Sequence, residues 1–179
     1  PKLPLSPYGV TKLAGEQYLY YYAQVHGLEY AVLRYSNVYG PRQDPHGEAG
    51  VVAIFSSRLR DGQPITIYGD GEQTRDYVYV GDVVRANLLV SDVALPPAVD
   101  LDSRGFNVGT GRETSVNELA RVLMEAAGRD AEVRYAAARP GELLHSCLDN
   151  TRLRQLGWEP AVSLREGLAR TYRYIAGGE

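Results

Sequence analysis

The sequence predicts an α/β fold, because segments with helical character alternate along the chain with short apolar segments typical of strands. The chain has 179 residues, of which 44% are hydrophobic and 23% are charged. This composition fits one ordinary globular domain of roughly 100–200 residues. The 19 glycines mostly fall at the ends of these segments rather than in a linker, which favours compact structure over disorder.

The first half of the chain begins with a predicted helix. Ser6 is a good N-cap and Pro7 suits the first helical position, so the helix begins there. It should run to about His26, because Gly27 follows as a helix-ending residue. The remaining elements of this half are a buried strand over 30–35, a polar loop over 36–50, a helix over 51–60, a strand over 65–68, a hairpin turn at 69–71, a strand or extended segment over 75–80, and a helix that Asp82 caps and that ends at about Ser91.

Two capping boxes mark helices in the second half. Each has a serine followed three residues later by a glutamate, at 115–118 and at 163–166. The helices that they begin should end near Ala127 and Gly177. The other elements are a surface loop over 92–104, a strand over 106–108, a strand over 133–135, a loop over 136–141, and a short helix that begins at Asn150 or Thr151 and stops at Gly157.

The charge balance and the single cysteine limit the partners and the compartment. A net charge of −3 gives no long-range attraction to nucleic acid or an anionic membrane, so neither is expected as a partner. No apolar run approaches the ~18–20 residues of a membrane-spanning helix. Cys147 cannot form an internal disulfide, which fits the cytoplasm, and it is expected to be a packed thiol. His26, His46 and His145 lack metal-ligand spacing, so no metal is predicted.

Tyr8 and Lys12 are the first candidates for catalysis. They are four residues apart near the start of the predicted helix, so both side chains lie on one face. An ammonium group beside a phenol favours the phenolate, and the positive end of the helix adds to this effect. Such a tyrosine suits general acid–base chemistry between an alcohol and a ketone. In a chain with 14 tyrosines the same spacing also arises by chance.

A series of motifs along the whole chain gives this pair a context. In order, the motifs are Ser6-Pro-Tyr-Gly-Val-Thr-Lys12, Glu16, Leu33-Arg34-Tyr35, Asn37-Val-Tyr-Gly-Pro-Arg42, Gly47-Glu-Ala-Gly-Val-Val52, Thr74-Arg-Asp-Tyr-Val-Tyr-Val-Gly-Asp-Val83, Phe106-Asn-Val-Gly-Thr-Gly111 and Arg139-Pro-Gly-Glu142. This series resembles the nucleotide-sugar epimerase/dehydratase branch of the extended short-chain dehydrogenase/reductase family. The resemblance implies an NAD-dependent 4-epimerase that interconverts UDP-glucose and UDP-galactose.

The resemblance also implies a particular fold. It predicts the second half of a Rossmann-like parallel sheet, over about 7–40 and 75–110, together with the smaller C-terminal α/β substrate-binding domain, over about 41–74 and 111–179. The glycine-rich phosphate turn of the family's first half is not found in this sequence, which also lacks an initiator Met. We therefore expect an incomplete catalytic module that binds NAD poorly and is inactive on its own.

NAD is the expected cofactor, and four residues match its contacts in the family. The resemblance implies that Tyr8 removes the proton from the sugar 4-hydroxyl while hydride passes to NAD, and that hydride then returns to the other face of the 4-keto sugar. Lys12 is implied to hold the nicotinamide ribose and to favour the Tyr8 phenolate. Tyr35 and Val38 match positions near the nicotinamide.

A UDP-sugar is the expected substrate, and nine residues match its contacts in the family. These are Asn37, Arg75 and Arg139 for the diphosphate, Val51 and Val52 for backbone contacts, Thr66 and Tyr68 for the uracil pocket, Glu142 for the uridine ribose, and Ser146 beside the sugar. Glu142 departs from the usual Asp. Purely structural roles remain open for some of these residues. Val51, Val52 and Thr66 also suit a hydrophobic core or a strand, and surface arginines such as Arg75 and Arg139 are usually solvated.

Two further expectations concern substrate range and assembly. Ser146 falls where some family members carry a large Tyr, so the smaller side chain leaves room for a 2-N-acetyl group on the sugar. The run Tyr20-Tyr21-Tyr22 places aromatic side chains around much of one helical turn, and a helix apolar on more than one face is usually buried by a partner. In the family this helix pairs with its mate, so the resemblance implies a homodimer through 7–26. Burial within one subunit is the alternative.

Two other functions remain open at this point. One is a sister enzyme, a nucleotide-sugar 4,6-dehydratase or UDP-glucuronate decarboxylase. The other is a non-catalytic fragment that binds UDP-sugar weakly through Arg75 and Arg139 and shows no turnover.

Overall fold

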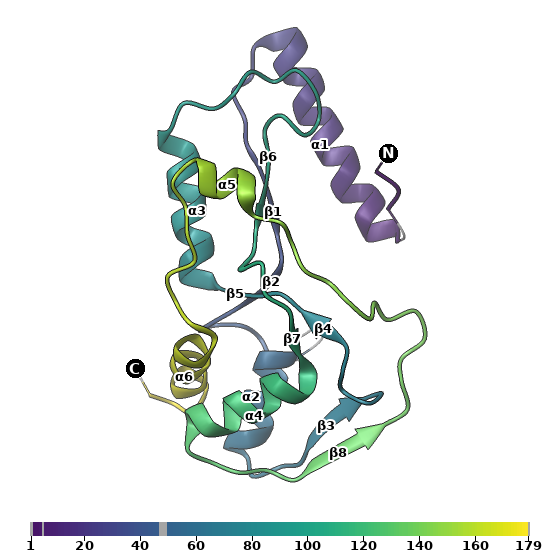
Figure 1. Ribbon diagram of the computed structural model, residues 1–179, viewed down its shortest axis with the longest axis vertical. Helices are drawn as coiled ribbons and strands as arrows, with labels where there is room; N and C mark the ends of the chain where they lie inside the picture. The colour runs from purple at the N-terminus through teal and green to yellow at the C-terminus, as the bar shows by residue number, and fades with distance from the viewer. Residues whose placement is uncertain (1, 5, 47–49, 179) are drawn as a thin grey trace.

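The computed structural model describes residues 2–4, 6–46 and 50–178. Helices and strands alternate along the chain, which confirms the predicted α/β class (Figure 1). The helices are α1 Pro7–His26, α2 Val51–Arg60, α3 Val80–Asp92, α4 Val116–Ala127, α5 Thr151–Gln155 and α6 Leu164–Ile175. The strands are β1 Val32–Tyr35, β2 Asn37–Tyr39, β3 Ile65–Tyr68, β4 Thr74–Arg75, β5 Tyr77–Tyr79, β6 Gly105–Val108, β7 Thr114–Ser115 and β8 Val133–Ala136.

The strands form short pairs, most of them parallel. β1 pairs with β6, β2 with β5 and β3 with β8 in parallel, whereas β4 and β7 are antiparallel. Ser36 separates β1 from β2, and its backbone N–H donates to the Val108 carbonyl at 2.9 Å. The next N–H, of Asn37, donates to the Asp76 carbonyl at 2.9 Å. The chain therefore changes its neighbour from β6 to β5 at this point, and Asn37 begins the second strand.

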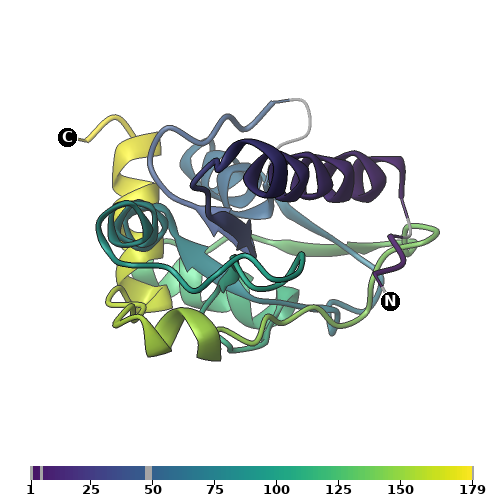
Figure 2. The same ribbon diagram turned by 90° about the horizontal axis from the view of Figure 1, so that it is seen from above.

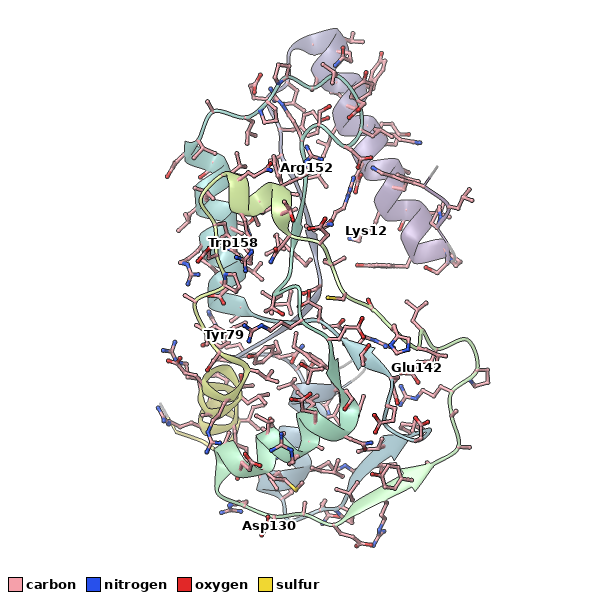
Figure 3. The ribbon with its side chains drawn as sticks, viewed as in Figure 1. Lys12, Tyr79, Asp130, Glu142, Arg152 and Trp158 are labelled. Carbon is pink, nitrogen blue, oxygen red and sulfur yellow. The ribbon has the colours of Figure 1, made fainter. Side chains whose placement is uncertain are left out.

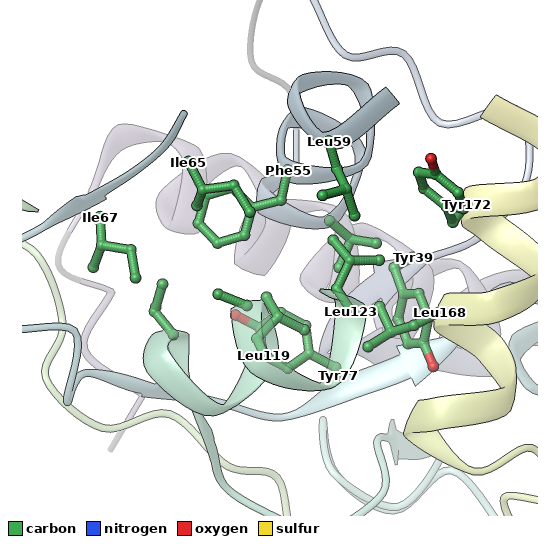
Figure 4. Packing of buried hydrophobic residues seen from close by; sticks show 13 residues of the cluster. Tyr39, Phe55, Leu59, Ile65, Ile67, Tyr77, Leu119, Leu123, Leu168 and Tyr172 are labelled. Carbon is green, nitrogen blue, oxygen red and sulfur yellow. The ribbon is translucent and has the colours of Figure 1, made fainter. Parts of the chain in front are cut away.

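The hydrophobic core has two clusters of buried side chains. The first fills the space between α2, α4, α6 and β3, where Phe55, Leu59, Leu119 and Leu168 pack together (Figure 4). The second lies between α3, α5, β1 and β6 and includes Trp158, whose Nε1 donates to the Asp82 carbonyl at 2.9 Å. In both clusters, helices cover a parallel strand pair, as expected for an α/β protein.

Helix α1 lies on one side of the β1–β6 pair, with α3 and α5 on the other (Figure 1, Figure 2). Its bounds confirm the prediction: the Ser6 hydroxyl accepts from the Gly9 N–H at 3.0 Å, and Gly27 ends the helix with φ +68°. It contains no buried residue. Contact with the rest of the chain includes an Arg34–Glu16 ion pair at 2.6 Å. The helix thus leaves most of its surface open.

Both predicted capping boxes begin helices. The Ser115 hydroxyl accepts from the Glu118 N–H at 3.1 Å, and Ser163 accepts from Glu166 at 3.3 Å. The confirmed helices α4 and α6 follow directly. No helix among the described residues has the length and apolar character needed to cross a lipid bilayer.

Three local predictions were wrong. The expected loop over 36–50 contains β2, because backbone pairing with distant β5 outweighs its polar surroundings. The turn at 69–71 does not join a hairpin, since β3 pairs with β8 and β4 with β7. Asp82 does not cap α3, which begins at Val80. Its buried carboxylate instead accepts from the Val162 N–H at 3.2 Å.

Candidate functional site

A cavity of about 500 Å³ lies between α2, β3, β5 and the segment over 137–149. That segment has no helix or strand, and we call it the strap. The volume suits a small organic ligand. The cavity is lined by Asn37, Gly50, Val51, Ile54, Phe55, Arg58, Thr66, Ile67, Tyr68, Gln73, Arg75, Tyr77, Val116, Arg139 and Glu142.

The cavity gathers seven of the nine predicted substrate residues from distant parts of the chain. They are Asn37, Val51, Thr66, Tyr68, Arg75, Arg139 and Glu142. Strand β3 brings Thr66 and Tyr68 to the cavity lining, and the strap, which follows the paired strand β8, brings Arg139 and Glu142 to it.

Arg75 joins β4 to the strap. Its Nη1 donates to the Leu143 carbonyl and to its neighbour Thr74, both at 2.7 Å, while Nη2 donates to Glu142 at 3.3 Å. The Thr74 N–H donates to the Leu144 carbonyl at 2.8 Å. Glu142 is labelled in Figure 3, where the strap extends away from α4 and β7. Arg75 therefore holds the strap against the cavity and keeps its guanidinium in a defined position.

Arg139 stacks on a cavity wall. Its guanidinium carbon lies 4.0 Å from the centroid of the Tyr68 ring, a cation–π contact. Gln73 fixes the same strand end, because its amide donates to the Tyr68 carbonyl at 2.7 Å. With Arg58 as a third guanidinium and Glu142 as the only carboxylate of the described lining, the cavity carries a net positive charge. It is therefore suited to an anionic ligand.

Tyr77 lines the cavity and has a buried hydroxyl. Its side chain is 5% exposed, and within the described residues its hydroxyl has no hydrogen-bond partner. Burial raises the pKa of Tyr77 to about 12, although the charge of Arg75 opposes the shift. The phenol stays protonated at neutral pH and can donate or accept one hydrogen bond.

Tyr8 and Lys12 form a pair on the open face of α1 but do not line the cavity. Lys12 Nζ lies 5.2 Å from the centroid of the Tyr8 ring, and Tyr8 is 71% exposed. Lys12 projects from α1, on the far side of the strap from α4 (Figure 3). An accessible phenol and ammonium on one helix face fit the hydroxyl groups and carbonyl oxygens of a dinucleotide such as NAD. These residues could hold that cofactor.

The remaining predicted site residues lie outside the cavity lining. Tyr35 is 48% exposed and accepts a hydrogen bond from Asn87 Nδ2 at 3.0 Å. Val38 packs against the second hydrophobic cluster. Val52 is 2% exposed and belongs to the first cluster, so its side chain serves the core. Ser146 is partly exposed on the strap.

Several lining residues were not predicted. Ile54, Phe55 and Arg58 follow Val51 at spacings of three, four and seven along α2. This is the period of one helix face, so the sequence held a signal for them once Val51 was placed at the site. Gln73 and Val116 carried no such signal.

Two further sequence features are the Gly47–Val52 motif and the single cysteine. The Gly47–Val52 motif lies partly outside the described residues, which exclude 47–49. Cys147, expected to be packed, is exposed, because the strap has no covering element at this point. Slight burial and the negative charges of Asp76 and Glu113 raise the pKa of the Cys147 thiol. This disfavours the thiolate and hence a nucleophilic role.

The fold and site together define an α/β protein with a cavity suited to a small anionic ligand. Residues 1–109 match the NAD dependent epimerase/dehydratase family. A putative UDP-glucose 4-epimerase of Methanocaldococcus jannaschii is 46% identical over 175 residues, which cover 98% of this chain and 55% of the relative. Relatives named dTDP-glucose 4,6-dehydratase and UDP-glucuronate 4-epimerase also match.

Solved structures agree with the sequence matches. The UDP-glucose 4-epimerase of Thermotoga maritima, crystallised with UDP-glucose, has a TM-score of 0.90 at 52% identity, over 98% of this chain and 55% of that one. The UDP-glucose 4-epimerase of Thermus thermophilus in complex with NAD has a TM-score of 0.87 at 45% identity, over 99% and 56%. This chain belongs to the NAD dependent epimerase/dehydratase family. It spans about half the length of the relatives that it matches.

Proposed function

We propose that the whole protein is a nucleotide-sugar 4-epimerase that interconverts UDP-glucose and UDP-galactose. The observation that carries this proposal is the single cavity that collects Asn37, Thr66, Tyr68, Arg75 and Arg139. The similarity of this chain to UDP-glucose 4-epimerases, with 52% identity to the Thermotoga maritima enzyme, supports 4-epimerisation over the other reactions of the family.

The cavity chemistry supports a nucleoside diphosphate as the ligand. Arg75 and Arg139 present planar guanidinium groups, which bind phosphate oxygens through two parallel hydrogen bonds. Arg75 is already oriented by the Leu143 carbonyl, so little rotamer freedom is lost when the ligand binds. Asn37 adds a neutral donor, and Thr66 and Tyr68 form the wall for the base.

The proposed reaction uses the pair on α1. Bound NAD supplies a reversible hydride acceptor. Tyr8 takes the proton of the sugar 4-hydroxyl at its Oη, so the C4 carbon becomes a ketone as its hydride leaves. Lys12 stabilises the phenolate through its charge. When the 4-keto sugar is reduced again on its opposite face, Tyr8 Oη would give the proton back to the C4 oxygen, so no net oxidation occurs.

Turnover of UDP-galactose by the whole protein tests this function. We expect UDP-glucose as the product, detected in a coupled assay, and a loss of at least a hundredfold in kcat for Tyr8→Phe, since general acid–base catalysis typically contributes 10²–10⁴-fold. Tyr18→Phe on the same helix is the matched control. Undiminished turnover by Tyr8→Phe would refute the role of Tyr8.

Product analysis separates the competing functions. A 4-keto-6-deoxy sugar from a nucleotide-glucose would identify a dehydratase, and release of carbon dioxide from UDP-glucuronate would identify a decarboxylase. Binding of UDP without turnover by the whole protein would support a non-catalytic role. For the 179 residues expressed alone, we propose UDP binding without turnover.

Two finer proposals concern substrate range and assembly. Ser146 leaves room for a 2-N-acetyl group, so Ser146→Tyr should lower turnover of UDP-N-acetylhexosamines selectively; equal loss on both sugars would contradict this. Helix α1 also exposes Tyr18 (69%) and Tyr21 (54%), and these apolar rings support a homodimer through this helix. Sedimentation equilibrium of the wild type and of Tyr21→Glu tests the dimer.

A further inference from the structure

Arg58 lies at one end of the cavity, far from Asn37. Arg58 and Val51 both line the cavity from α2, and a helix rises 1.5 Å per residue, so about 10 Å of helix separates them. The start of α2 lies close to Asn37, because Gln43 donates to the carbonyl of the adjacent Val38 at 3.1 Å while its side chain lies against Gly50. The cavity therefore extends from Asn37 to Arg58.

The far end of the cavity is also the start of β3. After α2 the chain reverses direction, with the Gln63 N–H donating to the Arg58 carbonyl at 2.8 Å. β3 begins two residues later at Ile65, which places Thr66 beside the end of α2. Arg58 and Thr66 thus line the same end of the cavity. If Arg75 and Arg139 hold the diphosphate, this end is left for the base.

Arg58 is the guanidinium of this cavity with no other task. Arg75 is bonded to the strap, and Arg139 stacks on Tyr68. Within the part of the chain that the structure describes, the Arg58 guanidinium makes no hydrogen bond or ion pair. Its side chain is exposed and contributes to the cavity lining.

We propose that Arg58 is a specificity-determining residue that selects uracil over cytosine. A guanidinium can only donate hydrogen bonds, so it requires an acceptor on the base. Uracil presents a carbonyl at C4, where cytosine presents an amino group that only donates. In this proposal, Arg58 donates to the C4 carbonyl of uracil, the position at which the two bases differ, and it faces a second donor when cytosine binds. This inference rests on the proposed function, because it assumes a nucleoside diphosphate in the cavity.

Calorimetric titration of the purified protein with UDP and with CDP tests the inference. We expect the wild type to bind UDP at least tenfold more tightly than CDP, since a site built to bond a polar group discriminates strongly against its replacement. Arg58→Met should weaken UDP binding about tenfold, the loss of one hydrogen bond to a charged group. CDP binding should change less than twofold, so the preference for UDP should disappear.

Arg60→Met provides the matched control. Arg60 lies on the same helix, bonds to Asp61 and the Ile175 carbonyl, and does not line the cavity. Both affinities should stay unchanged in this variant. If Arg58→Met weakens UDP and CDP binding equally, the UDP/CDP ratio stays the same; this result would assign Arg58 to the phosphates and overturn the inference. A variant in which neither affinity changes would overturn it as well. Absence of UDP binding by the wild type would overturn the proposed function together with the inference, whereas UDP binding with an unchanged ratio would overturn the inference alone.

Discussion

The guanidinium carbon of Arg139 lies 4.0 Å above the Tyr68 ring, which connects the strap to β3. A cation–π contact at a partly exposed site contributes about 0.5–1 kcal/mol. Because the contact fixes the position of Arg139 before the ligand binds, its loss should weaken UDP binding by roughly two- to fivefold in Tyr68→Leu. Tyr68→Phe keeps the ring and should bind UDP like the wild type. Calorimetry with UDP measures both, and equal weakening in the two variants would show that the hydroxyl matters rather than the ring.

Arg75→Lys should disturb both ligand binding and the strap. The arginine bonds to Leu143 and Glu142 come from two separate nitrogens, Nη1 and Nη2. The three donors of lysine all lie on one nitrogen, which cannot span these acceptors and also bind a phosphate group as a planar fork. We expect UDP affinity to fall at least tenfold and limited proteolysis within 137–149 to become faster. Arg134→Lys is the control, because Arg134 pairs with exposed Glu132 and lies outside the cavity lining. Unchanged proteolysis in Arg75→Lys would mean that other contacts hold the strap.

Much of the fold could be predicted from local signals. Serine caps at Ser6, Ser115 and Ser163 begin helices, because each side chain satisfies a backbone N–H that the helix itself cannot bond. β2 was missed, since three residues carry little periodicity and the strand depends on pairing with β5 about 40 residues away. The prediction that Asp82 caps α3 was wrong for a related reason. Its carboxylate accepts a hydrogen bond from the N–H of Val162, which is distant in the sequence.

The candidate site could also be predicted only in part. The motifs identified seven residues that line one cavity, among them Arg75 and Arg139. Arg58 was missed although the helical period of α2 places it on the same face as Val51. Gln73 was not identified, because nothing in the local sequence shows that the start of β4 borders the same space. Tyr8 and Lys12 lie apart from that space, so their catalytic role stays a prediction.

Acid should reduce the stability that Glu16 contributes. Burial would raise the pKa of Glu16, but hydrogen bonds and charges from Arg34 and Lys2 outweigh it and lower the pKa below the ordinary value. A carboxyl with a lowered pKa in the folded state stabilises above its unfolded pKa of ~4.3, and this stabilisation is lost as the pH falls through the folded value. Glu16→Gln should therefore lower the free energy of unfolding at pH 7 by about 1 kcal/mol or less, because solvent screens the pair.

Urea unfolding at pH 7 and at pH 3 checks this expectation. The difference between the wild type and Glu16→Gln should shrink at the lower pH, where the wild-type carboxyl begins to protonate. Glu159→Gln, on an exposed side chain, should show a smaller difference at pH 7. A gap that grows in acid would contradict the lowered pKa.

Gly109→Ala should destabilise the fold because of the nearby carboxylate of Asp76. A Cβ at position 109 would lie 2.3 Å from Asp76 Oδ2. That carboxylate cannot move freely, since its oxygens accept from the Thr110 and Gly111 N–H groups at 2.8 and 3.1 Å. Overpacking at such a site costs typically 1–3 kcal/mol, and we expect a loss in this range by urea unfolding. Gly15→Ala, where an added Cβ meets open space within α1, should instead stabilise by about 0.5–1 kcal/mol.

The background of Asp76→Ala separates the clash from other effects of Gly109→Ala. Asp76→Ala is itself destabilising, because it removes a buried carboxylate that accepts from the N–H groups of Thr110 and Gly111. If the clash causes the loss, adding Gly109→Ala to Asp76→Ala should cost only a small further amount, so that the two changes are strongly non-additive. Additive losses would mean that backbone conformation at position 109, rather than the approach of Asp76, requires glycine.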